Sequence, residues 1–329
     1  MNRLKDLQSS GLALMLLSTF FFGFKPILVR MALDEGVTPE DILILRLMIA
    51  VPLFFLTVLL MRKLGDMWMP PVEFILSSIV AVAGMGGAML FSFYAIKYLG
   101  ASVSTLVIFV FPAITALLSF VFFGEPVTSR KKLSLLISFL GIILVVIPLS
   151  NGNGFGNIAG FDPGKGLFFA MLCALCWAST QVAYQKILEK RSPVTTALMT
   201  SVAMLVFFFA MNGMPSTGLT TRAWTAVILL GTVSWYVPFF LAMYALKMIG
   251  ASKAAIVQST GPGLTVLIAG LMLGEKLVAL QFGGMFLLIY AVYMIGSEKS
   301  PARADQEPST VAIRNGGTIE PEPLPVRDE

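Results

Sequence analysis

The chain has 329 residues, of which 57% are hydrophobic and 12% are charged, and its mean hydropathy is +0.86. Soluble globular domains carry roughly 25% charged residues, so this composition excludes a soluble protein and indicates one that is dissolved in lipid. With no histidine and two cysteines, the chain offers no zinc-binding spacing and no imidazole for acid–base chemistry near neutral pH. We therefore expect no metal and no cofactor.

Apolar segments recur along almost the whole chain. A transmembrane helix needs about 20 mostly apolar residues. We predict ten such helices, at residues 12–33, 41–61, 74–96, 101–123, 133–149, 166–187, 195–213, 224–246, 251–273 and 278–295. Gly100 and Gly250 are expected to end helices and let the chain reverse. The fold class is therefore an all-α membrane protein of ten transmembrane helices, with the first apolar stretch retained.

The distribution of Lys and Arg predicts the orientation, because basic residues are enriched in cytoplasmic loops. With the N-terminus inside, the inner side carries Arg3, Lys5, Arg62, Lys63, Arg130, Lys131, Lys132, Lys186, Lys190, Arg191, Lys247 and Lys253. The outer side carries Arg30, Lys97, Lys165, Arg222 and Lys276. We expect a multi-pass protein of the cell inner membrane with both termini cytoplasmic. Residues 297–329, rich in Pro, Glu, Ser and Gly, are expected to form a disordered cytoplasmic tail.

An internal repeat divides the hydrophobic part of the chain. The segment 94–102, YAIKYLGAS, returns at an offset of 150 residues as YALKMIGAS at 244–252. The register continues through Pro112 and Pro262 to the Gly-Glu pairs at 124–125 and 274–275. We predict one five-helix repeat in residues 1–150 and a second in 151–296. Because five is odd, the copies cross the membrane in opposite senses, and inverted repeats of this kind enclose a binding site near the midplane.

The repeated pattern resembles the EamA branch of the drug/metabolite transporter superfamily. Further likenesses are Phe22-Gly23, Trp177-Ala178 and Arg46, which stand where that family carries an aromatic–small pair or an arginine. The resemblance covers about residues 10–296. It implies two EamA-like repeats, a substrate site in a central cavity, and efflux as the commoner direction. Lys25-Pro26 departs from the pattern, and Ser201 stands where a second copy of Arg46 would align.

Two cations within predicted spans, Lys25 and Arg46, are the leading candidates for substrate binding. A charge near the bilayer centre costs at least about 2.5–3.5 kcal/mol, so lipid exposure is disfavoured. Both could attract a carboxylate or phosphate, and Arg suits this by its bidentate geometry. In the structural alternative, Arg46 extends to the membrane interface and Lys25 donates to carbonyls freed near Pro26.

Aromatic and amide side chains within the spans form a second set of candidates. We expect Trp177, Gln181, Trp235, Gln258, Tyr94 and Tyr244 to line the cavity, with hydrogen bonding between helices as the alternative. Pro112 and Pro262, which interrupt helical hydrogen bonding at repeat-related positions, are candidate hinges or simple kinks. The Cys173–Cys176 pair is interpreted as packing residues.

These features predict a secondary transporter and not an enzyme. Its substrate would be a small anionic or zwitterionic metabolite, such as an amino or organic acid, exported by alternating access. There is no G-x-x-x-x-G-K-[ST] loop for ATP. The alternatives are a multidrug exporter, which would need acidic residues in its cavity, a membrane scaffold or sensor, and an intramembrane enzyme. The expected partners are the substrate and membrane lipid, with no nucleic acid; a homodimer stays open.

Overall fold

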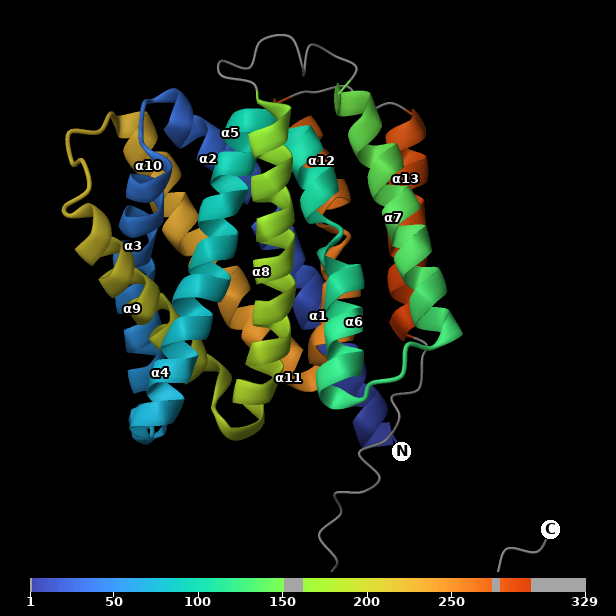
Figure 1. Cartoon of the computed structure of the whole chain (residues 1–329), viewed down its shortest axis with the longest axis horizontal. Coiled ribbons are helices and arrows are strands. Elements are labelled where there is room, and N and C mark those ends of the chain that lie inside the picture. Colours follow the sequence, from blue (N-terminus) through green and yellow to red (C-terminus); the bar gives the residue numbers. More distant parts are fainter. Residues whose placement is uncertain (1, 151–161, 274–278, 297–329) are drawn as a thin grey trace, which may run out of the picture. The chain divides into compact units, whose positions relative to one another are not determined.

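The computed structural model describes residues 2–150, 162–273 and 279–296, and within these residues every regular element is helical (Figure 1). The N-terminal elements are α1 Asn2–Phe22, α2 Lys25–Asp34, α3 Pro39–Leu60, η1 Leu64–Met67, α4 Pro71–Ile79, η2 Val80–Gly86, α5 Gly87–Ile108, α6 Phe111–Phe123 and α7 Ser129–Ser150. The C-terminal elements are α8 Pro163–Lys190, α9 Pro193–Asn212, α10 Thr221–Gly231, η3 Thr232–Tyr236, α11 Val237–Gln258, α12 Gly261–Leu273 and α13 Ala279–Gly296. The predicted all-α class is confirmed.

Six helical segments of the described chain are long and apolar enough to cross a membrane. They are Ser9–Asp34, Pro39–Leu60, Pro71–Leu99, Gly164–Lys190, Pro193–Asn212 and Thr221–Gln258. The apolar helices Phe111–Phe123 and Phe282–Ile295 are shorter. The described residues thus have the helices of a membrane protein, while the count of ten stays a prediction.

Local sequence explains where α3 and α9 begin. The hydroxyls of Thr38 and Ser192 accept hydrogen bonds from backbone N–H groups three residues later, and Pro39 and Pro193 follow directly. A hydroxyl cap satisfies a free helical N–H, and proline has none to satisfy at the first helical position. Both helices therefore begin with the same arrangement, a capping hydroxyl followed by proline.

Three helices are interrupted just before a proline that the sequence marked as a break or kink within a predicted span. The turn residues are Gly23-Phe24, Phe109-Val110 and Ser259-Thr260, and Pro26, Pro112 and Pro262 follow within the first two residues of α2, α6 and α12. Proline lacks the N–H that would bond to the carbonyl four residues earlier, so the helix opens there. Gly250 has a left-handed φ of 78°, which confirms the predicted change of direction, whereas α5 is assigned as one helix past Gly100.

The segments η2 and η3 are π-helical and lie between α4 and α5 and between α10 and α11. Their positions nearly coincide under the 150-residue offset of the sequence repeat. In η2, a Cβ atom at Gly84 would collide with the Thr180 side chain, and one at Gly86 would lie 2.8 Å from the Phe208 ring. Small residues therefore allow close helix packing here.

The most extensive helix contacts join elements before residue 150 to elements after it. The principal pairs are α5 with α8, α1 with α11, α3 with α9, and α7 with α13. Figure 1 shows α5 beside α8 and α7 beside α13. The largest buried apolar cluster includes Phe54, Met89, Phe93, Trp235 and Phe239 from α3, α5, η3 and α11. Met89, Phe93 and Trp235 of this cluster surround the side chain of Arg46.

Candidate functional site

Arg46 lies in α3 with an exposed fraction of 0%. It is one of the largest fully buried side chains in the structure. The sequence-based alternative, in which Arg46 extends to the membrane interface, is therefore wrong. A guanidinium this deep must be stabilised by its surroundings or by a ligand, because burying an unpaired charge is costly.

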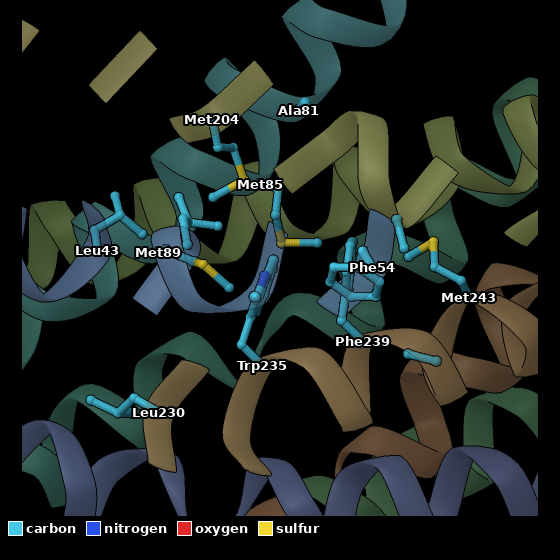
Figure 2. Close-up of a cluster of buried hydrophobic side chains, with 14 of the residues drawn as sticks. Leu43, Phe54, Ala81, Met85, Met89, Met204, Leu230, Trp235, Phe239 and Met243 are labelled. Atoms are coloured by element: carbon cyan, nitrogen blue, oxygen red, sulfur yellow. The ribbon is translucent and has the colours of Figure 1, made fainter. Parts of the chain in front are cut away.

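Aromatic rings and one thioether surround the Arg46 guanidinium. Its Cζ atom lies 4.8 Å from the centroid of the Trp235 ring and 5.7 Å from that of Phe93. Its Nη2 group contacts the sulfur of Met89. Figure 2 shows Trp235 between Met89 and Phe239 in the centre of the cluster. Aromatic faces attract a cation, and a thioether is a weak acceptor, so these contacts stabilise the charge without neutralising it.

Two nitrogen atoms of Arg46, Nε and Nη1, have no hydrogen-bond partner among the described residues. No ion pair between described residues involves Arg46 either. An unmade hydrogen bond from a buried group costs about 1–3 kcal/mol, and more for a charged group. The guanidinium is therefore suited to bind an oxyanion, which it can hold by two parallel hydrogen bonds.

Trp235 is also completely buried, and its indole plane is fixed from two sides. Its Nε1–H donates to the Ser201 hydroxyl over 3.3 Å, and its ring stacks on Phe239 with centroids 4.4 Å apart. Ser201 lies in α9, so α3 and α9 contact the same indole through Arg46 and Ser201.

Lys25 is half-buried and is the first residue of α2, directly after the break at Gly23-Phe24. It lies within electrostatic range of both Arg46 and Cys173. Its side chain forms no hydrogen bond or ion pair with another residue in the described ranges, including the carbonyls near Pro26 that the sequence suggested. Two unneutralised cations therefore act on one region of the interior.

Three of the predicted residues, Trp177, Gln181 and Gln258, form one hydrogen-bonded cluster. The carbonyl oxygen of Gln258 accepts from Trp177 Nε1 over 3.2 Å and from Gln181 Nε2 over 2.6 Å. The amide nitrogen of Gln258 donates to the sulfur of Met15 over 3.4 Å. Phe22 and Phe111 pack edge-on against Trp177. The cluster joins α8 to the end of α11 beside the break at Ser259-Thr260, and its described donors already have acceptors.

The structure does not bring Tyr94 and Tyr244 together. The hydroxyl of Tyr94 donates to Glu40 over 2.5 Å, at the start of α3. The hydroxyl of Tyr244 approaches the sulfur of Met61 at 3.7 Å, just past the end of α3. The 22 residues of α3 span about 33 Å, so these repeat-related tyrosines lie near opposite ends of α3.

The remaining candidates have simple surroundings. Pro112 and Pro262 are buried at the starts of α6 and α12. Cys173 and Cys176 are both free thiols, so the structure contains no disulfide between them. At the start of α8, the backbone N–H of Lys165 holds the pKa of the exposed Asp162 carboxyl below its ordinary value.

Three residues of the site could not be recognised from the sequence. Met89 and Phe93 contact Arg46 from α5, and Met15 contacts Gln258 from α1. Apolar residues inside an apolar span carry no signal of their own, since most of them face lipid or the core. The sequence suggested Ser201 only as a counterpart of Arg46 and gave no sign of its contact with Trp235.

Comparison with known proteins adds a family to this geometry. The model of the EamA-like transporter family matches residues 9–147 and 164–297. An uncharacterized transporter of Synechocystis sp. is 25% identical and covers 91% of this chain and 97% of its own length. Uncharacterized transporter YcbK of Bacillus subtilis is 24% identical and covers 85% of this chain and 92% of its own. A crystal structure with 19% identity superimposes with a TM-score of 0.71 over 87% of this chain and 96% of the other, which shows a shared fold.

Proposed function

Because the chain belongs to the EamA-like transporter family, we propose that it is a secondary transporter for a small anionic or zwitterionic metabolite, such as an organic or amino acid. In this proposal the protein lies in the cell inner membrane with both termini cytoplasmic. It exports its substrate by alternating access, which exposes one central site first to one face and then to the other.

Arg46 is the observation that carries the substrate class. Its guanidinium is buried between Trp235 and Phe93, and its Nε and Nη1 atoms have no partner among the described residues. A bound carboxylate or phosphate would neutralise the charge and satisfy these donors. The neighbouring cation Lys25 adds attraction for the same anion. We assign Arg46 and Lys25 to the anionic group, Trp235 to the orientation of Arg46, and the Trp177–Gln181–Gln258 cluster to the wall beside the α11 break.

Two inverted five-helix repeats, residues 1–150 and 151–296, would provide the alternating access. Three observations support this arrangement. The family model matches the two parts separately. The helix pairs α5–α8 and α1–α11 have reciprocal places in the repeat. Tyr94 and Tyr244 lie at opposite ends of α3, as inversion requires. Pro112 and Pro262 would then be the hinges at which α6 and α12 bend.

A multidrug exporter is less consistent with the interior. Cationic drugs would require buried carboxylates, and no Asp or Glu belongs to the buried polar residues of the described ranges. Buried Arg46 would repel a cation. The interior of the described structure therefore favours an anionic substrate over a cationic drug.

Transport by purified protein in proteoliposomes tests the proposal. Vesicles loaded with a panel of unlabelled organic and amino acids would be assayed for exchange against each labelled compound. For the best substrate, Arg46→Gln should weaken half-saturation about 100-fold, because a charge-assisted bidentate contact is worth about 3 kcal/mol. Arg46→Lys should retain part of the activity, since the charge remains without the planar geometry.

Lys63→Gln is the matched control, because it removes an exposed basic residue whose partner is Asp66 in the same loop. It should transport like the parent protein. Full transport of the preferred anion by Arg46→Gln would contradict the assigned site. Preferred exchange of cationic compounds would contradict the substrate class.

A further inference from the structure

An ion pair with several supporting contacts connects α4 to the loop before α9. Arg191 Nε donates to Glu73 Oε1 over 2.7 Å, and its Nη2 donates to Glu73 Oε2 over 2.7 Å. Its Nη1 donates to the carbonyl of Trp68 over 3.0 Å, and Lys247 Nζ donates to the carbonyl of Arg191 over 3.0 Å. The guanidinium thus holds the carboxylate bidentately, which is the strongest geometry for this pair.

The surroundings of this pair strengthen it. The side chains of Arg191 and Glu73 have exposed fractions of 15% and 29%, so water screens them only partly. The hydrogen bonds to Glu73 raise the pKa of Arg191 above its ordinary value, which keeps the guanidinium charged. Glu73 belongs to the first matched stretch of the chain and Arg191 to the second. The contact therefore fastens one half of the protein to the other.

A second ion pair connects the halves at the start of α3. Glu35, in the loop between α2 and α3, lies 3.5 Å from the guanidinium of Arg222 in the first turn of α10. Its carboxylate also accepts a hydrogen bond from the hydroxyl of Thr220 over 2.6 Å. The two charged groups share one contact. The side chain of Arg222 has an exposed fraction of 62%, so water screens this ion pair well.

The two pairs have reciprocal positions. Glu35 lies just before α3 and reaches the start of α10, while Arg191 lies just before α9 and reaches the start of α4. The pairs also lie at opposite ends of α3, which is about 33 Å long. Figure 1 shows α2 and α10 at one end of the helices and α4 at the other. The same connection thus occurs once on each face, and in both pairs the first half supplies the acid and the second half supplies the base.

We propose that Glu73–Arg191 and Glu35–Arg222 are the inner and outer gates of this transporter, and that the stronger inner gate keeps the resting protein closed toward the cytoplasm. This inference rests on the proposed function, since a gate needs a pathway to close. Opening the cytoplasmic side requires α4 to separate from the loop before α9, which breaks the bidentate contact. Opening the other side breaks one exposed ion pair, so the empty protein favours the outward-open state.

Native Cys173 can report on the gates, because its thiol is buried and within electrostatic range of Lys25. In a Cys176→Ala background, the rate of labelling by a charged, membrane-impermeant maleimide would be measured in inside-out and right-side-out vesicles. Glu73→Gln should raise the cytoplasmic-side rate about tenfold, since losing a charge-assisted pair of this kind shifts the equilibrium by about one decade. Glu35→Gln should raise the outer-side rate about twofold at most, as expected for an exposed pair.

Three further variants make the result specific. Lys63→Gln, which breaks an exposed ion pair within one loop on the inner side, should leave both rates unchanged. Arg191→Lys, which keeps the charge and loses the bidentate contact, should raise the inner rate by about threefold. Glu73→Arg combined with Arg191→Glu should restore slow labelling.

Unchanged cytoplasmic labelling in correctly folded Glu73→Gln would overturn the inference, as would equal increases from both faces. The labelling needs no substrate, so it is independent of the transport assay. If labelling changes as expected while no organic or amino acid of the panel is exchanged, the two contacts control access to the interior and the proposed substrate class fails. If exchange occurs while labelling is insensitive to Glu73, the proposed function stands and the gates fail.

Discussion

Two buried polar regions of the protein differ in how completely the chain satisfies them. Around Gln258, the Trp177 and Gln181 donors share one carbonyl oxygen, and the Gln258 amide reaches Met15. Around Arg46, two guanidinium nitrogens have no partner in the described ranges, although the side chain is equally buried. The chain itself satisfies the first region, whereas in the second it leaves two donors without a partner among the described residues.

Because of this difference, substitutions in the two regions should affect different properties, the stability of the fold in one and the binding of a ligand in the other. A ligand that entered the Gln258 cluster would have to displace hydrogen bonds already made inside the protein. A ligand at Arg46 would form bonds that are otherwise missing, and its whole interaction energy would favour the complex. We therefore expect substitutions at Gln258 to change mainly the stability of the fold, and substitutions beside Arg46 to change mainly transport.

Gln258→Leu should have the largest effect on stability. It leaves the Trp177 and Gln181 donors without an acceptor, and two interhelical hydrogen bonds within a membrane together contribute about 2 kcal/mol. The midpoint of thermal unfolding in detergent should fall, while the half-saturation constant for transport changes less than about twofold. Gln181→Leu, which removes one of the two donors, should cost about half as much. A large transport defect at unchanged stability would move the substrate site to this cluster.

Lys25→Met should weaken transport without lowering the stability of the fold, the opposite of what we expect for Gln258→Leu. It removes the half-buried cation near Arg46, and the expected loss is about tenfold in the half-saturation constant for the anionic substrate, or about 1.4 kcal/mol. The unfolding midpoint should stay constant or rise, because like charges no longer repel each other in the interior. Uptake and efflux in vesicles, measured beside the parent protein, check this. Full transport activity would exclude Lys25 from the anion site.

Ser201→Ala should have the smallest effect of the three. The Trp235 indole loses its acceptor at 3.3 Å, a long hydrogen bond worth about 0.6 kcal/mol in a membrane, so half-saturation should weaken about threefold. Ser201→Thr should retain the bond and the activity. Ser234→Ala is the matched control, because the buried hydroxyl of Ser234 has no partner among the described residues. Equal effects of the two alanine substitutions would mean that Ser201 does not position the indole.

Much of the fold was predictable because lipid imposes a simple rule on the sequence. Long apolar segments mark helices, and caps such as Thr38-Pro39 mark where they begin. Pro26, Pro112 and Pro262 indicated breaks within the spans, but the residues at which the helices end, Gly23-Phe24, Phe109-Val110 and Ser259-Thr260, were not predicted, since each interrupted span remains apolar on both sides. The π-helical form of η2 was also missed.

Candidate site residues could be predicted where a charged or amide side chain stands within an apolar helix. Arg46, Lys25, Gln181 and Gln258 are conspicuous in apolar helices, and the sequence identified all four as candidates. Their partners could not be deduced, because contacts between α3, α5 and η3 depend on how the helices pack. The positions of Tyr94 and Tyr244 near opposite ends of α3 agree with the predicted inversion, but their partners Glu40 and Met61 could not be deduced from the two similar segments.

The π-helical segments η2 and η3 have a mechanical consequence. Each lies inside a long helical run whose first turn carries one residue of a proposed gate, Glu73 in α4 and Arg222 in α10. Helices bend sharply at π-bulges more readily than in regular α-helix. In the proposed mechanism, strain at one gate would therefore relax at this joint before it reached the other gate. A continuous α-helix would transmit that strain and couple the two gates directly.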